Sequence, residues 1–151
     1  MATTSGVRPT YQALGRKEQA LCLRRDVYSG TLRLEGEDDE YTLIAANNYA
    51  LSLIGLQRFE EVKSLLRRTL PVAQRVLGEN TETTLRMRWY YADALYEDDG
   101  ATLEDLREAV NTLEETEQTA RRVLGEAHPH TVGLEEELQA ARDALYARGL
   151  P

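Results

Sequence analysis

Residues 42–78, TLIAANNYALSLIGLQRFEEVKSLLRRTLPVAQRVLG, decide the fold of this 151-residue chain. Residues 42–57 contain no charged side chain, although 29% of the chain is charged. From Arg58 onward, apolar and charged residues alternate at helical spacing. The stretch therefore predicts one largely buried helix and one half-exposed helix, joined by a short turn at residues 55–57.

The same pattern recurs along the chain at nearly constant intervals. Thr42 and Thr84 are 42 residues apart, and Thr84 and Thr131 are 47 residues apart. The second interval is longer because five extra residues fall within residues 97–102. Repetition of this kind predicts a stack of helix pairs, in which each pair buries its apolar face against its neighbours.

Composition narrows the range of partners and compartments. The formal net charge of −8 argues against nucleic-acid binding, which needs a concentrated basic surface. Cys22 is the lone cysteine, so no intrachain disulfide can form, and we expect a reducing compartment. No apolar run approaches the roughly 20 residues needed to span a bilayer, and residues 1–10 lack the apolar core of a secretory signal. We expect a cytoplasmic protein without membrane insertion.

Local signals divide the chain into elements. Gly36 suits a helix stop in the left-handed conformation, and Thr42, Thr84 and Thr131 suit helix starts. Pro9 corresponds to a mid-helix position of the next repeat, so the first helix of the first repeat should be degenerate. We predict a flexible N-terminus at 1–8 and one helical repeat domain at 9–150, with repeats at about 9–36, 42–78 and 84–125 and a capping helix at 131–148.

Two further signals concern the second helix of a pair. Pro71 deletes the hydrogen bond to the carbonyl of Arg67, and we expect it to bend its helix without breaking it. Thr102 followed by Asp105 forms a start signal for the helix predicted at residues 103–124.

Three short motifs resemble those of tetratricopeptide repeats, in the 42-residue form found in kinesin light chains. They are residues 47–50 (NNYA), residues 57–62 (QRFEEV) and residues 124–131 (LGEAHPHT). The resemblance covers about residues 14–148. It implies an all-α protein, a right-handed α-solenoid of antiparallel helix pairs with about three hairpins and a C-terminal capping helix. The chain lacks the long heptad segment that joins kinesin light chains to the motor, so only the repeat type is carried over.

In stacks of this type the first helix of each pair lines a concave groove, and this groove is the candidate binding site. Asparagine amides there can bond to the backbone of an extended peptide, and Arg86 can pair with a carboxylate. Trp89 and Tyr96 are aromatic anchors of the kind favoured at binding hot spots. Packing within the core is an equal alternative for Trp89 and an alternative for Ile44 and Leu51, and an internal hydrogen bond is the alternative for Asn47. The predicted groove residues are Ile44, Asn47, Asn48, Leu51, Arg86, Trp89, Tyr90, Asp93 and Tyr96.

The sequence contains no constellation that indicates catalysis. The only histidines, His128 and His130, lie far along the chain from Cys22, so no nucleophile has an adjacent base. A metal site at the two histidines would have only Glu126 nearby as a further ligand. We therefore expect neither an enzyme nor a bound metal or cofactor, but a non-enzymatic module or scaffold that binds a protein or peptide.

The alternative is a structural role. A shortened first repeat would leave Leu14, Leu21 and Tyr28 uncovered at the N-terminal end of the stack. An apolar end of this kind favours packing against another copy or a larger assembly, which would make the protein a homo-oligomer.

Overall fold

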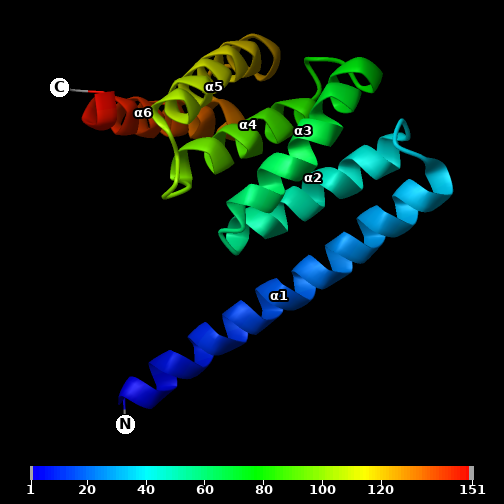
Figure 1. Ribbon diagram of the computed structural model, residues 1–151, viewed down its shortest axis with the longest axis vertical. Helices are drawn as coiled ribbons and strands as arrows, with labels where there is room; N and C mark the ends of the chain where they lie inside the picture. The colour runs from blue at the N-terminus through cyan, green and yellow to red at the C-terminus, as the bar shows by residue number, and fades with distance from the viewer. Residues whose placement is uncertain (1, 150–151) are drawn as a thin grey trace.

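Six helices, joined by short connecting segments, span residues 2–149 of the computed structural model, which describes side chains over residues 13–149 (Figure 1). These residues contain no β-strand, so the predicted all-α class is confirmed. None of the six has both the length and the apolar content needed to cross a membrane. The helices are α1 (Ala2–Glu35), α2 (Glu40–Gly55), α3 (Phe59–Val76), α4 (Glu82–Glu97), α5 (Leu103–Leu124) and α6 (Pro129–Gly149).

Each helix packs against the next helix in the chain. In addition, α2 contacts α4 and α4 contacts α6, so these three helices form a row, which we call the inner row. The outer helices α1, α3 and α5 pack against this row. The chain therefore begins with an outer helix and ends with a member of the inner row.

The first helix is the longest element. α1 has 34 residues and α2 has 16, and Figure 1 shows α1 running alongside α2 and continuing well beyond it. Residues 2–8, for which we expected a flexible segment, belong to α1, and Met1 lies outside the described residues. No turn separates a first inner helix from residues 16–35, because the described chain is helical throughout this region.

The predicted starts of the inner helices were wrong by two residues or more. Asp39 caps α2 by accepting hydrogen bonds from the backbone N–H groups of Tyr41 and Thr42, at 2.8 and 3.2 Å. Thr81 caps α4 through the N–H of Thr84. Thr42 and Thr84 lie one turn inside their helices and are buried, because an earlier side chain already provides the oxygen acceptor.

The predicted turns agree with the structure. α2 ends at Gly55 and α3 begins at Phe59, and Gly36 has a positive φ of 88° as its helix-stop position requires. At the start of α5, the Thr102 hydroxyl accepts from the N–H of Asp105 and the Asp105 carboxylate accepts from the N–H of Thr102. This reciprocal pair satisfies two backbone donors that the helix itself leaves free.

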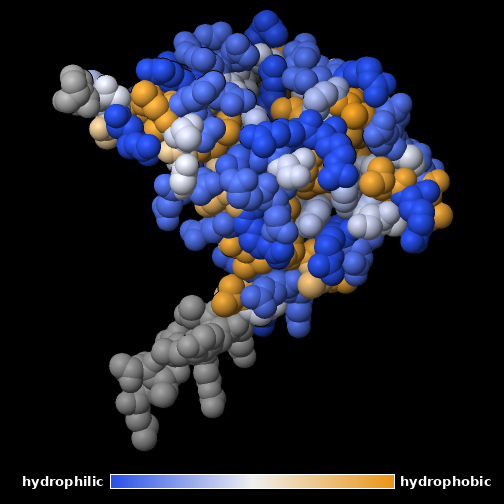
Figure 2. Space-filling model, in the orientation of Figure 1, coloured by the Kyte–Doolittle hydropathy of each residue, from blue (hydrophilic) through white to orange (hydrophobic). Residues whose placement is uncertain are grey.

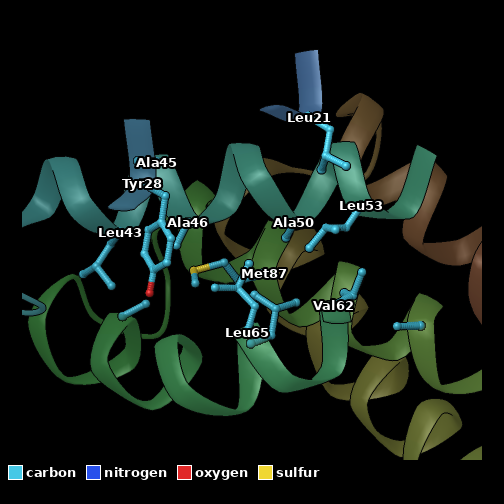
Figure 3. Close-up of a cluster of buried hydrophobic side chains, with 13 residues drawn as sticks. Leu21, Tyr28, Leu43, Ala45, Ala46, Ala50, Leu53, Val62, Leu65 and Met87 are labelled. Atoms are coloured by element: carbon cyan, nitrogen blue, oxygen red, sulfur yellow. The ribbon is translucent and has the colours of Figure 1, made fainter. Parts of the chain in front are cut away.

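The larger part of the core lies around α2 (Figure 3). Ala46 and Ala50 are fully buried, and these small side chains let the neighbouring helices approach α2 closely. Leu21 and Tyr28, which we expected to be uncovered, are buried against this cluster. Tyr28 stacks on Tyr49 of α2, with ring centroids 6.0 Å apart. For these two residues the expectation was wrong, because α1 turns this face toward α2. Leu14, the third residue of that expectation, is exposed.

Candidate binding surface

After Glu40 in its first turn, the exposed face of α2 is uncharged. Ile44, Asn48 and Leu51 recur at spacings of four and three residues, so they form one stripe along the helix, and all three are exposed. Asn47, predicted to share this face, is buried instead, and its side-chain oxygen has no hydrogen-bond partner among the described residues. α2 therefore offers two aliphatic side chains and one amide to a partner.

The equivalent face of α4 is polar and half-buried. Arg86, Tyr90 and Asp93 lie 42 residues after the three exposed residues of α2 and occupy the same helical positions. The pKa of Tyr90 is raised by burial. The same stripe therefore changes from apolar and amide groups on α2 to charged and phenolic groups on α4.

Arg86 links α4 to the start of α6. Its guanidinium lies 3.7 Å from a carboxylate oxygen of Glu82, and its Nε donates to Nε2 of His130 at 3.4 Å. Burial, and secondly the charge of Arg86, lower the pKa of His130. This imidazole is therefore neutral at physiological pH, which is the form that can accept the hydrogen bond from Arg86.

Trp89 packs against α6. A Cβ built on Gly133 would lie 2.5 Å from the outer ring of the indole, so the indole occupies the space that a side chain at Gly133 would fill. The ring also meets His130 edge-on, with centroids 6.3 Å apart. Both alternatives for Trp89 are thus partly realised: its outer ring fills the α4–α6 interface, and the side chain remains half-exposed.

Three carboxylates gather where α4 and α6 meet. Asp93 and Glu97 of α4 lie beside Glu137 of α6, and the hydroxyl of Tyr96 donates to Glu137. Burial, followed by the charges of Glu137 and Glu97, raises the pKa of Asp93 to about 8. Burial also raises the pKa of Glu97. The cluster therefore holds a proton at neutral pH and would gain from a cationic group placed next to it.

Within residues 13–149, two groups of side chains have the composition of metal ligands, with ligand atoms within 4.8 Å of one another. One is the carboxylate cluster, and the other combines Glu82 with His128 and His130. In the second group, Nδ1 of His128 already accepts from the backbone N–H of His130 at 3.1 Å, and Arg86 contacts the other two members. A cation at this group would have to displace the guanidinium. Glu126, considered above as a ligand, pairs with Arg121 at 3.7 Å instead.

The structure brings Arg86 and Trp89 together with His130, and it brings Asp93 and Tyr96 together with Glu137. The α6 residues were missed from sequence. Glu137 lies 47 residues after Tyr90, so the repeat interval alone would have placed it in the predicted set. Glu82 has no comparable signal, because its role depends on how the first turns of α4 and α6 meet.

In comparisons with known proteins, the chain matches no protein-family model and no curated protein.

Proposed function

We propose that the chain is a non-enzymatic protein-interaction module or scaffold of the tetratricopeptide type, which binds a peptide or protein segment along its inner row. The observation that carries the proposal is the exposed, uncharged stripe Ile44, Asn48 and Leu51 on α2. It is continued at the same helical positions by Arg86 and Asp93 on α4. The lone cysteine, which has no partner within the chain for a disulfide, favours action in the cytoplasm.

The chemistry of the stripe suits an extended segment. The amide of Asn48 can donate to and accept from a peptide backbone irrespective of its sequence, while Ile44 and Leu51 provide apolar contacts on either side. Specificity would come from α4 and α6. There the carboxylates of Asp93 and Glu137 favour a lysine or arginine in the bound segment.

A peptide library tests the proposal. Peptides that vary in net charge are selected on the purified chain, and the dissociation constant of the best binder is measured by fluorescence anisotropy. We expect the best binders to be basic. We also expect Asn48→Ala with Glu137→Gln to weaken binding by about tenfold or more, because it removes the amide of the stripe and one of the carboxylates that favour a cation.

The matched control is Asn111→Ala with Glu115→Gln, which changes the same two residue types at exposed positions on α5. Equal binding by the wild type, the inner-row variant and the control would refute the proposed surface. Selection of acidic peptides only would refute the assigned role of the carboxylates.

A further inference from the structure

The outer helices carry equivalent residues, but α1 differs from α3 in what it buries. Leu23 and Val27 of α1 lie 42 residues before Leu65 and Thr69 of α3. Leu65 and Thr69 are 4% and 5% exposed, whereas Leu23 and Val27 are 67% and 57% exposed. α1 therefore presents to solvent a stripe that α3 buries against its neighbours.

α2 differs from α6 in the same way. His130, Gly133 and Glu137 of α6 face α4, through the contacts with Arg86, Trp89 and Tyr96 described above. Their equivalents on α2, 89 residues earlier in the sequence, are Tyr41, Ile44 and Asn48. All three are exposed. Both differences have one cause, since no inner helix precedes α2 within residues 2–149.

The uncovered faces of α1 and α2 adjoin in a groove. Val27, Gly30 and Leu34 line it from α1, and Tyr41 lines it from the start of α2. A Cβ at Gly30 would meet no atom within 4 Å, so another helix can approach α1 closely at this point. Figure 2 shows apolar surface exposed at both ends of the described part of α1. The rest of its lining is polar, Asp26, Thr31, Glu35 and Asp39, so the groove suits an amphipathic helix that brings both apolar and basic side chains.

We propose that a second copy of this chain fills the groove, with its α1 packed antiparallel against α1 of the first. Charge favours this orientation. Near the start of the described part of α1, Arg16 and Lys17 outweigh Glu18, and at the end of α1 and just after it, Glu35 and Glu37 outweigh Arg33. Antiparallel packing sets the cations of each copy against the carboxylates of the other, whereas parallel packing sets like charges together.

The arrangement is two-fold symmetric, so each contact occurs twice and both grooves are filled. In this register Leu23 of one copy lies near Gly30 of the other, in the groove. This pairing covers Leu23 and Val27, whose equivalents on α3 are buried within the chain. The pairing does not depend on peptide binding by the inner row.

Sedimentation equilibrium of the full chain over a dilution series tests the pairing. The wild type should be dimeric at high concentration, and Leu23→Glu with Val27→Glu should weaken dimerisation by about tenfold or more. Circular dichroism should show unchanged helix content, because both residues are exposed. The matched control is Val123→Glu with Val132→Glu, at exposed apolar positions on α5 and α6, and it should dimerise like the wild type.

A wild-type monomer at every concentration would overturn the proposal, and so would an α1 variant that associates as strongly as the control. Orientation is tested in a Cys22→Ser background by mixing Gln19→Cys and Arg33→Cys, two exposed positions at opposite ends of the stripe. Antiparallel packing predicts mainly the mixed disulfide, and mainly self-disulfides would contradict it. Asn48→Ala with Glu137→Gln should weaken peptide binding and leave dimerisation unchanged, so failure of one proposal can be told from failure of the other.

Discussion

Asp93 shows how burial and neighbouring charge act on a single residue. The carboxyl is half-buried beside Glu97 and Glu137, and one of its oxygens has no hydrogen-bond partner among residues 13–149. Its pKa is about 8, so the folded protein binds this proton more tightly than the unfolded chain does. The stabilisation from Asp93 is therefore complete below the ordinary pKa of an aspartate and is lost as the pH rises through about 8.

Replacing Asp93 with asparagine keeps the shape and removes the titration. We expect Asp93→Asn to be more stable than the wild type at alkaline pH, and the advantage should grow by at most about 1.4 kcal/mol per pH unit. Urea unfolding between neutral and alkaline pH measures this. The window avoids acid pH, where the lowered pKa of His130 acts with the opposite sign. Parallel stability profiles for variant and wild type would contradict the assignment.

Gly133 provides a second test at the residue scale. In a helix interior, glycine to alanine normally stabilises by up to about 1 kcal/mol. At Gly133 the new methyl group would overlap the indole of Trp89, so we expect destabilisation of about 1–3 kcal/mol. Gly15→Ala is the matched control, because no atom lies within 4 Å of a Cβ there, and it should stabilise α1.

Denaturant unfolding of both glycine variants decides between these outcomes. Trp89→Phe should recover part of the stability lost in Gly133→Ala, since the smaller phenyl ring leaves room for the new methyl group. A stabilising Gly133→Ala would show that Trp89 does not pack on α6.

At the scale of the helices, local signals predicted some boundaries and not others. The glycine stop at Gly36 and the start of α5 at Leu103 follow from residues next to each other in sequence, and both were predicted. The starts of α2 and α4 were not, because several acceptors compete within each turn. Asp39 and Thr81 are the residues that cap these helices, and not Thr42 and Thr84 three residues later. Which acceptor caps a helix depends on where the helix packs, and a local pattern does not contain that information.

The capping pair of α5 is the clearest local prediction to test. Thr102→Ala removes the hydroxyl that accepts from the N–H of Asp105, and we expect a loss of about 1 kcal/mol in the free energy of unfolding. Thr119→Ala is the control, because the Thr119 hydroxyl bonds only to the carbonyl one turn earlier in the same helix. Urea unfolding that shows equal losses for the two variants would contradict the capping role.

At the scale of the whole molecule, repetition predicted the order of elements but not which faces would be covered. The interval of 42 residues is enough to match Ile44, Asn48 and Leu51 of one repeat with Arg86, Tyr90 and Asp93 of the next. It did not predict that Leu21 and Tyr28 are buried. Burial there depends on which face of α1 packs against α2, and the spacing of the repeats does not indicate that face.

The central claim is that a partner segment lies along the inner row. Three rare side chains of the sequence can report on this binding by NMR. Isoleucine occurs only at positions 44 and 54, and the single tryptophan is Trp89. Ile44 is on the exposed stripe, and Ile54 packs against the core. Methyl-labelled isoleucine and the indole N–H therefore report on the stripe of α2, the core and the face of α4.

The most direct measurement is an NMR titration of these three signals with the selected basic peptide. It is best recorded on Leu23→Glu with Val27→Glu, so that self-association does not move the signals. We predict that the Ile44 methyl and the Trp89 indole shift to saturation together, while the Ile54 methyl stays in place. An unchanged Ile44 signal at saturating peptide would contradict the claim that the inner row is the binding surface.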